Sequence, residues 1–596
     1  MSGPRTKTVD VLIVGGGPAG MISALCLSAC GVSSLIVERK TGVEEHPKAH
    51  ELNTRSIEIL NGLGISTDEL AVEASPESDG SRILFCRTIN EEFGRIDLEV
   101  DGASTQKYRR HLRSKRAYLN LSQTEFEKVV AQHVHSAPSI EWLSGHEWKG
   151  LDQDEGSVRS MIRELSSGTK QVVESRYVIA ADGAGSRVRK ALGIGMQGPE
   201  KLQDFLNIYF ENGLRDRVDT PAKLYWILHP EAPGAFIAHH MDKRWTYNMP
   251  LVTPFESEED YPEEVLKKRI HTALGFDAGI EIESVSRWRM TVQVAEAFRQ
   301  GRAFLVGDAA HRFPPTGGLG MNTGIADAHN LAWKLAATLR GAPDKLLDTY
   351  EAERRPVAQR NAHESATNYE KIFEVFEAFG LQRDGLDRLA QLKSTALFRW
   401  LPRGIQTLAL RAVLAIPHRL LNRFTTKPEV REKVEHAIAD QLGHFDRIGL
   451  DIGYVYGQGA LTPERKETPD YPVSTYEPST IPGSRFPHVE LGAHRGDSSH
   501  DLVDYDCFRL LVAGEPGAWQ KAEEDLLQQG VKIDVESVGT VPADEGGRSR
   551  LTELCRLGSS GALLLRPDGH VGWRCEEGPE DRSATLLAAA GEMSLV

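Results

Sequence analysis

Three glycines near the N-terminus have the spacing of a dinucleotide-binding turn. Gly15, Gly17 and Gly20 follow the apolar run Val9–Val14 and precede a stretch of small residues that suits a helix. In this context glycines permit a tight turn and let backbone N–H groups approach a pyrophosphate. Glu38 stands 18 residues after Gly20, at the end of a second apolar run, where a carboxylate can bind ribose hydroxyls. The pattern predicts a nucleotide site, and the alternative is a glycine-rich turn without a ligand.

Two further glycine-rich turns follow apolar runs later in the chain. One is Asp182–Arg189, and the other begins at Gly307-Asp308 and continues into the loop 314–322. Asp308 can accept a hydrogen bond from a polyol, and the loop offers N–H groups to another polar part of a flat cofactor. Each segment alone is compatible with a simple turn. Together they predict a ligand that is stretched along a sheet.

A mixed α/β protein is needed to position these motifs. The N-terminal strand–turn–helix–strand pattern and the later apolar runs indicate one sheet whose strands return after long insertions. Aromatic and β-branched residues in the insertions favour an antiparallel sheet, and Ala and Leu at helical spacing follow it. The predicted divisions are 1–80, 111–198 and 290–360 for a discontinuous nucleotide-binding domain, 81–110 and 199–289 for the inserted sheet, 361–456 for a helical region, 457–490 for a linker and 491–596 for a small α/β module.

Composition excludes several classes of protein. The chain has 596 residues, of which 40 % are hydrophobic and 26 % are charged, and these values rule out the disordered and fibrous classes. Its formal net charge is −15 and it has no block of like charges, so we expect no nucleic-acid partner. The six cysteines show no CxxC spacing. We therefore expect free thiols, a cytoplasmic location and no metal site.

One uncharged stretch, residues 11–37, has the composition of a signal or membrane segment. The sequence from Gly15 to Pro18 interrupts it where a continuous helix would be required. We therefore expect no stable insertion into a membrane.

The three motifs, in this order, resemble the fingerprint of single-component flavoprotein monooxygenases of the para-hydroxybenzoate hydroxylase type. The segment 307–334 is most similar to the phenol and 2,4-dichlorophenol hydroxylase branch, and the resemblance covers about residues 8–360. The end of the chain is similar in placement to the thioredoxin-like domain of many of these enzymes. The resemblance implies a Rossmann-like FAD-binding domain, an inserted β-sheet substrate domain and a C-terminal thioredoxin-like domain. We also expect a homodimer or a higher homo-oligomer.

FAD is the cofactor that the resemblance implies. Asp182 is implied to serve both FAD and the reduced nicotinamide cofactor. Because only one nucleotide-binding turn is present, NADPH or NADH should bind transiently, without a Rossmann domain of its own. The implied FAD contacts are Gly15, Gly17 and Gly20 at the pyrophosphate, Glu38 and Arg39 at the adenosine end, Asp308 at the ribityl chain or pyrophosphate, and Gln123, Gly320, Met321 and Asn322 near the flavin ring.

The implied reaction is hydroxylation of a phenolic or polycyclic aromatic substrate. NAD(P)H reduces FAD, O₂ reacts at flavin C4a, and the terminal oxygen of the resulting hydroperoxide passes to the ring. The protein must exclude water and help to deprotonate a phenol. His50 is the candidate base, because a neutral imidazole can take a proton near neutral pH. A histidine with a structural hydrogen bond is an equal alternative.

Few residues of the substrate pocket can be recognised from the sequence. Trp226, Trp245, Tyr247 and Trp288 are candidates for a flat pocket, and ordinary sheet core is the alternative for each. We predict Trp226 and Tyr247, together with Pro314 from the loop near the flavin, as substrate contacts. Two other functions stay open on the same fold, namely Baeyer–Villiger oxygenation and flavin binding without catalysis.

Overall fold

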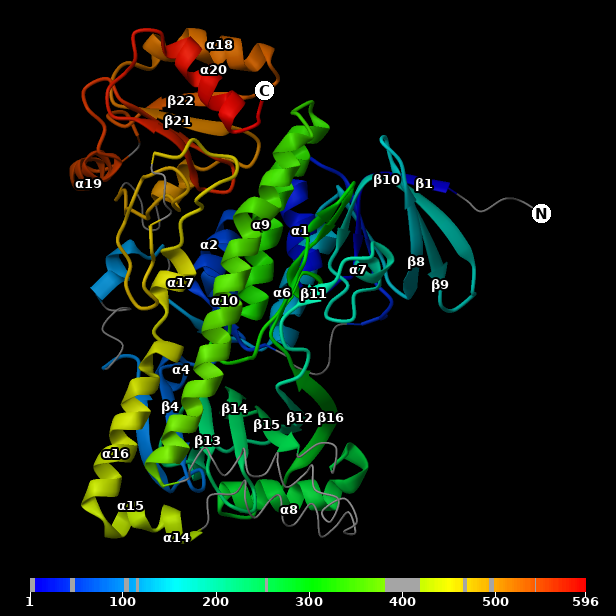
Figure 1. Ribbon diagram of the computed structural model, residues 1–596, viewed down its shortest axis with the longest axis vertical. Helices are drawn as coiled ribbons and strands as arrows, with labels where there is room; N and C mark the ends of the chain where they lie inside the picture. The colour runs from blue at the N-terminus through cyan, green and yellow to red at the C-terminus, as the bar shows by residue number, and fades with distance from the viewer. Residues whose placement is uncertain are drawn as a thin grey trace.

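The computed structural model describes residues 6–42, 49–100, 107–113, 117–251, 256–380, 418–464, 469–492, 498–541 and 543–596. Three larger sheets with their helices follow one another along the long axis of the molecule (Figure 1). The parallel sheet lies between the antiparallel sheet and the C-terminal sheet. This arrangement confirms the predicted α/β class. None of the helices in the described ranges is long and apolar enough to span a bilayer.

The parallel sheet forms because β1 (Thr6–Val14) ends in four buried apolar residues that need cover on both faces. Its strand order is β18-β19-β10-β1-β2-β7, and β1 pairs in parallel with both of its neighbours. Helix α1 (Pro18–Ala29) follows β1 directly and packs against two other helices. The other elements of this layer are β2 (Ser34–Val37), α6 (Gln123–Ser136), β7 (Ile140–Leu143), β8 (His146–Gln153), β9 (Val158–Glu164), β10 (Lys170–Ala180), β18 (Arg299–Gln300) and β19 (Ala303–Leu305).

The antiparallel sheet has the order β16-β12-β15-β14-β13-β4-β5. One face packs against α8 (Glu263–Leu274), and the other faces the parallel sheet. Side chains alternate between these faces along each strand. In β15 (Arg244–Leu251), Tyr247 and its alternate neighbours belong to the core under α8, so Thr246 and Asn248 point to the other face. The remaining strands are β4 (Arg82–Cys86), β5 (Glu92–Asp97), β12 (Gln203–Glu211), β13 (Leu224–Ile227), β14 (Gly234–His240) and β16 (Glu281–Met290).

Two long helices connect the layers. Helix α9 (Gly320–Leu339) packs beside α1 and runs away from the antiparallel sheet, and α10 (Lys345–Ala378) returns and reaches that sheet (Figure 1). Helix α10 continues through Pro356 and through residue 360, so the domain boundary predicted there falls within a single helix. The smaller helices that follow are α14 (His418–Leu421), α15 (Arg423–Thr426), α16 (Pro428–Ala439) and α17 (Ile448–Ile452).

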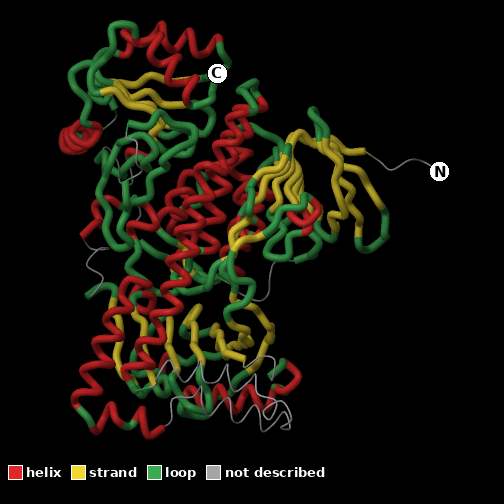
Figure 2. Tube along the Cα trace, in the orientation of Figure 1, coloured by secondary structure: helices red, strands yellow, loops and turns green. Residues whose placement is uncertain are grey.

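The C-terminal sheet has the order β22-β21-β23-β24, with a parallel pair and an antiparallel hairpin, as in the predicted thioredoxin-like module. Its core continues into that of the parallel sheet, because Phe508 packs edge-on against Trp333 of α9. Figure 2 shows that the described chain between α17 and β21 is mostly loop. The module contains β21 (Phe508–Val512), α18 (Gln520–Gln528), β22 (Ile533–Ser537), α19 (Glu545–Cys555), β23 (Ala562–Leu565), β24 (Val571–Cys575) and α20 (Arg582–Glu592).

Short elements complete the described chain. They include several that border the site described below. Their bounds are β3 (Glu51–Leu52), α2 (Thr54–Gly62), α3 (Thr67–Ala71), α4 (Glu77–Gly80), β6 (Leu119–Asn120), α7 (Arg187–Ala191), β11 (Met196–Gln197), β17 (Gln293–Ala295) and β20 (His311–Arg312).

Candidate active site

A cavity of about 1280 Å³ lies where the parallel sheet meets the antiparallel sheet. Its walls come from the ends of β1, β2 and β10, the loop before α9, and the face of the antiparallel sheet that α8 does not cover. The predicted site residues that line it are Gly15, Gly17, Glu38, Arg39, His50, Gln123, Asp182, Asp308, Pro314, Gly320 and Met321. Those that do not line it are Gly20, Asn322, Trp226 and Tyr247.

The three N-terminal glycines have different roles in the turn after β1. Gly15 has a φ of +106°, and a Cβ there would lie 2.3 Å from the carbonyl oxygen of Ala181. A Cβ on Gly20 would lie 2.0 Å from the carbonyl oxygen of Gly15. Gly17, which caps the N-terminus of α1, has nothing within 4 Å of its Cβ position. Two glycines therefore shape the turn, while Gly17 leaves open space above a helix N-terminus, as an anion requires.

Glu38 is held beside this turn. One of its carboxylate oxygens accepts the N–H of Gly16 at 2.7 Å, and the other accepts the N–H of Lys40 at 2.8 Å. Trp142 of β7 also lines this end of the cavity, and sequence reasoning did not select it. Its flat ring beside a carboxylate offers stacking and hydrogen bonding together, which suits a nucleoside.

The two predicted aspartates differ in their surroundings. Asp182 accepts hydrogen bonds from the hydroxyl of Ser186 at 2.5 Å and the N–H of Arg187 at 2.6 Å, so its carboxylate caps the start of α7. Asp308 lies in a short 3₁₀ turn after β19 and is exposed to the cavity. Asp182 thus organises the turn after β10, whereas Asp308 presents a carboxylate at the surface of the cavity.

Asn322 lies behind the cavity wall. Its side-chain oxygen accepts the N–H of Asn53 at 3.0 Å and the hydroxyl of Ser56 at 2.7 Å. Its amide nitrogen donates to the carbonyl oxygen of Gly318 at 2.7 Å. The buried Asn322 therefore ties the glycine-rich loop before α9 to α2, and it acts on the cavity by holding that loop.

His50 is fixed at the cavity by its ring nitrogen Nδ1, which lies 2.9 Å from Oδ1 of Asn120. The amide nitrogen of Asn120 donates to the carbonyl oxygen of Ala238 at 2.9 Å. Oδ1 must therefore be the acceptor for His50, so Nδ1 carries the proton and the neutral ring keeps Nε2 as a base. Burial lowers the pKa of His50 below its ordinary value, although Glu51 opposes this effect.

A buried group of charges stands behind His50. Glu51 pairs with Lys223 at 2.5 Å and with Arg447. Burial alone raises the pKa of the Glu51 carboxyl, but the two cations outweigh burial and hold that pKa well below its usual range. Glu51 belongs to β3, Lys223 directly precedes β13, and Arg447 directly precedes α17. The ion pairs therefore join three parts of the chain directly beside the candidate base.

The aromatic residues predicted for the pocket are placed elsewhere. Tyr247 lies on the α8 side of the antiparallel sheet, where its hydroxyl donates to the carbonyl oxygen of Ala232 at 2.9 Å. Trp226 lies in the core between that sheet and α10, where it stacks on Phe85. Trp288, another of the four aromatic candidates, does line the cavity and stacks on Phe205 at a centroid distance of 4.9 Å.

Polar side chains of the antiparallel sheet line the cavity instead. Asn207 and Asn248 are register partners on β12 and β15, and both reach it. Among the described residues, the side-chain oxygens of both asparagines have no hydrogen-bond partner. The sequence contains a pattern that indicates this placement, since Asn207 alternates with buried apolar residues along its strand. Reading that alternation would have identified these two amides as candidate ligand contacts.

Comparison with known families agrees with this geometry. Residues 8–365 match the family model described as an FAD binding domain, and residues 479–593 match the model described as the C-terminal domain of aromatic-ring hydroxylases. This chain belongs to the FAD-dependent aromatic-ring hydroxylases. The flavin hydroxylase is 30% identical to 2,4-dichlorophenol 6-monooxygenase of Cupriavidus pinatubonensis, over 98% of this chain and 96% of that one.

Two further proteins are similar to this hydroxylase over nearly its whole length. Tetracenomycin A2 monooxygenase-dioxygenase of Streptomyces glaucescens is 29% identical, over 98% of this chain and 96% of that protein. The crystal structure of the flavin-dependent monooxygenase PieE, in complex with FAD and substrate, superposes with a TM-score of 0.85 at 31% identity and covers 99% of both chains.

The residues present fit FAD. The open space at Gly17 and the helix N-terminus beneath it suit a pyrophosphate, and Glu38 suits a ribose. The cavity of about 1280 Å³ exceeds the roughly 300–1,000 Å³ of an ordinary small-molecule site. It therefore has room for FAD and for a second aromatic molecule next to it.

Proposed function

We propose that this hydroxylase uses NADPH or NADH and O₂ to hydroxylate a phenolic or polycyclic aromatic substrate, with His50 as the base. The observation that carries the proposal is the neutral imidazole of His50 at the wall of the cavity, whose Nε2 makes no hydrogen bond among the described residues and can accept a proton. When bound, FAD supplies the transfer of electrons from the nicotinamide and the activation of O₂. The residues of the chain supply binding, orientation and proton transfer.

His50 takes the proton of the substrate hydroxyl at Nε2. A phenolate ring is richer in electrons than a phenol ring, so this proton transfer prepares the ring carbon for oxygen. Asn120 keeps the imidazole in the required tautomer through the hydrogen bond at Nδ1. The low pKa of His50 that follows from burial keeps the imidazole neutral at neutral pH.

Two asparagine side chains on the cavity face of the antiparallel sheet support a class of substrate. The amides of Asn207 and Asn248 lie side by side in the cavity wall, and their oxygens lack donors among the described residues. These oxygens are buried in the wall, so a substrate hydroxyl supplies the donor when the amide group turns toward the cavity, and this pairing is favourable because buried polar atoms are costly when unpaired. We infer an aromatic substrate with hydroxyl groups along one edge, which agrees with the 2,4-dichlorophenol and tetracenomycin A2 in the names of the relatives.

Asn207→Leu should weaken substrate binding with little change in the stability of the protein. Because the change removes an amide oxygen that has no donor, the free energy of unfolding should stay within about 1 kcal/mol of that of the unchanged protein. The KM for the hydroxylated substrate should rise about tenfold, since the substrate loses a polar contact. Thermal unfolding and steady-state kinetics measure the two effects. An unchanged KM would remove Asn207 from substrate recognition.

The nicotinamide cofactor is expected to meet positive charge at the cavity. Arg187, Arg287 and Arg289 line it and are partly exposed there. Such a rim attracts an anionic dinucleotide and raises its local concentration. This rim supports NADPH or NADH as a transient partner, and comparing the rates of the two at several salt concentrations tests the proposal.

Asp308→Ala should weaken FAD binding about tenfold, because the turn loses the carboxylate that it presents to the cavity. Titration of the apoprotein with FAD, followed by flavin fluorescence, gives the Kd. Asp308→Asn is the matched variant that keeps the size and removes the charge. A Kd within twofold of that of the unchanged protein would exclude a direct contact.

The reaction itself is tested with a panel of mono- and polycyclic phenols. The expected result is NAD(P)H oxidation that depends on the phenol and a product with one additional ring hydroxyl. A ring-expanded ester or lactone would favour Baeyer–Villiger oxygenation instead. Tight flavin binding with no stimulated oxidation across the panel would favour a flavin-binding protein without turnover.

A further inference from the structure

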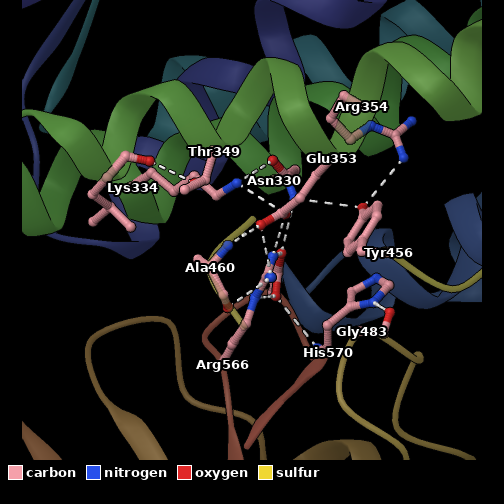
Figure 3. Close-up of polar contacts among 12 residues, drawn as sticks. Asn330, Lys334, Thr349, Glu353, Arg354, Tyr456, Ala460, Gly483, Arg566 and His570 are labelled. Atoms are coloured by element: carbon pink, nitrogen blue, oxygen red, sulfur yellow. Dashed lines mark hydrogen bonds and ion pairs between the residues drawn. The ribbon is translucent and has the colours of Figure 1, made fainter. Parts of the chain in front are cut away.

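A buried cluster of charges joins the C-terminal module to the two long helices (Figure 3). Glu353 of α10 accepts two hydrogen bonds from Arg566, at 2.7 and 3.0 Å. Lys334 of α9 lies 2.9 Å from the same carboxylate, and Arg566 also pairs with Asp568. Asn330 donates to Glu353 at 2.6 Å and to Asp568 at 3.2 Å. These five residues, at most 1 % exposed, are called the C-terminal ion cluster below.

A second buried group lies under the turn that carries Asp308. Asp327 of α9 contacts His311 at 2.6 Å and accepts the N–H of Gly307 at 3.3 Å. Its other carboxylate oxygen accepts Nε of Arg354 at 2.8 Å. Burial alone raises the pKa of Asp327, but His311 and Arg354 outweigh it and hold the pKa below its ordinary value. An ionised Asp327 therefore holds the Gly307–Asp308 turn from below.

Tyr456 connects these two groups. Its hydroxyl accepts a hydrogen bond from Arg354 at 3.3 Å and one from Asn330 at 3.4 Å (Figure 3). The ring of Tyr456 stacks on His570, which follows the turn of the hairpin between β23 and β24, at a centroid distance of 4.5 Å. A continuous series of side chains thus leads from the C-terminal module to the turn of Asp308.

The C-terminal ion cluster fixes the relative positions of the elements it joins more than it stabilises the fold. Buried ion pairs contribute little net stability compared with apolar side chains of the same size. Burial alone raises the pKa of Glu353, but Arg566 and Lys334 outweigh it and lower the pKa to about 2. Because each ionised group needs its partners at fixed positions, the cluster permits few arrangements of α9, α10 and the hairpin.

We propose that Tyr456 is a positioning residue for the flavin site, and that it couples the C-terminal module to the Gly307–Asp308 turn through Arg354 and Asp327. In this arrangement the module helps to set the position of the Asp308 carboxylate from behind the cavity. The proposal does not depend on which substrate is hydroxylated or on the role of His50. It predicts an effect on FAD binding itself.

Tyr456→Phe tests the proposal, because it removes the connecting hydroxyl and keeps the stacked ring. The Kd for FAD should rise about fivefold, while the midpoint of thermal unfolding of the apoprotein should stay within about 3 °C. Tyr454→Phe is the matched control, since its ring lies 5.5 Å from that of Tyr456 and the change removes none of the hydrogen bonds that join Asn330, Tyr456 and Arg354. An unchanged Kd in Tyr456→Phe would overturn the proposal.

A double-mutant cycle with Asp308→Ala separates coupling from a general effect. If Tyr456 acts through the turn, the two substitutions should raise the Kd by clearly less than the product of their separate factors. If the two factors simply multiply, Tyr456 does not act through Asp308 and the proposal is wrong. Both outcomes come from FAD titration alone, so they are independent of any assay of hydroxylation.

Discussion

His50→Gln is expected to lower kcat for hydroxylation about 100-fold and to leave FAD bound. Glutamine keeps a polar side chain at the cavity but cannot accept a proton near neutral pH. The proposed FAD contacts at Gly17 and Glu38 do not involve the imidazole, because Glu38 accepts the N–H of Gly16 and His50 contacts Asn120. Single-turnover measurement of product formation, with flavin absorbance recorded in parallel, separates the chemical step from cofactor loss. A kcat within twofold of that of the unchanged enzyme would remove His50 from proton transfer.

The pH dependence gives a second measure of the same residue. Only the neutral imidazole is a base, so the rate should fall as His50 becomes protonated on the acid side. Because burial lowers the pKa of His50 below its ordinary value of 6.5, the loss should occur below pH 6.5. The acid limb should be absent in His50→Gln. His436→Gln, on the exposed surface of α16, is a control that should keep both the rate and the limb.

The turn after β1, at the proposed FAD end of the site, could be predicted from sequence because its requirements are local. A tight turn with a positive φ at Gly15 and a close approach at Gly20 dictates residue type within a few positions of chain. The same holds for Glu38, which lies at the end of the next strand. Each of these positions depends on its own strand–turn–helix unit, and the rest of the fold does not alter it.

The substrate end depends on which face of a strand is covered, and a single strand does not reveal this. Tyr247 and Asn248 are neighbours, so one faces α8 and the other faces the cavity. Composition favours the aromatic residue for a pocket, whereas packing against α8 assigns it to the core. Trp226 is on the cavity side of its strand, but contacts around α10 cover it. Predicting either residue correctly requires the position of a helix distant in sequence.

The ion clusters show a second limit of local prediction. Glu353 and Arg566 are 213 residues apart, and they meet because a helix and a hairpin dock against each other. The sequence contains many acidic and basic residues with no distinguishing spacing. Their importance follows only from burial, since an exposed pair contributes little and a buried unpaired charge is costly.

Gly17→Asp is expected to abolish FAD binding, with a rise in Kd of at least about 100-fold, and to leave the apoprotein folded. The Cβ position of Gly17 is open, its φ of −76° suits any residue, and aspartate is a favoured helix N-cap. The new carboxylate would stand where the pyrophosphate must approach the start of α1, so both bulk and charge oppose binding. Gly17→Asn adds almost the same bulk without the charge, and the difference between the two Kd values measures the electrostatic part.

Gly20→Ala is the contrasting change in the same turn. Its added methyl group would lie 2.0 Å from the carbonyl oxygen of Gly15, so the turn itself must move. We expect a loss of about 3 kcal/mol or more in the free energy of unfolding of the apoprotein, whereas Gly17→Asp should change it by less than about 1 kcal/mol. Chemical denaturation of the two apoproteins measures both values. Equal destabilisation by the two changes would mean that Gly17 is also required for the fold of the turn. The open space above Gly17 would then be no evidence for a cofactor site.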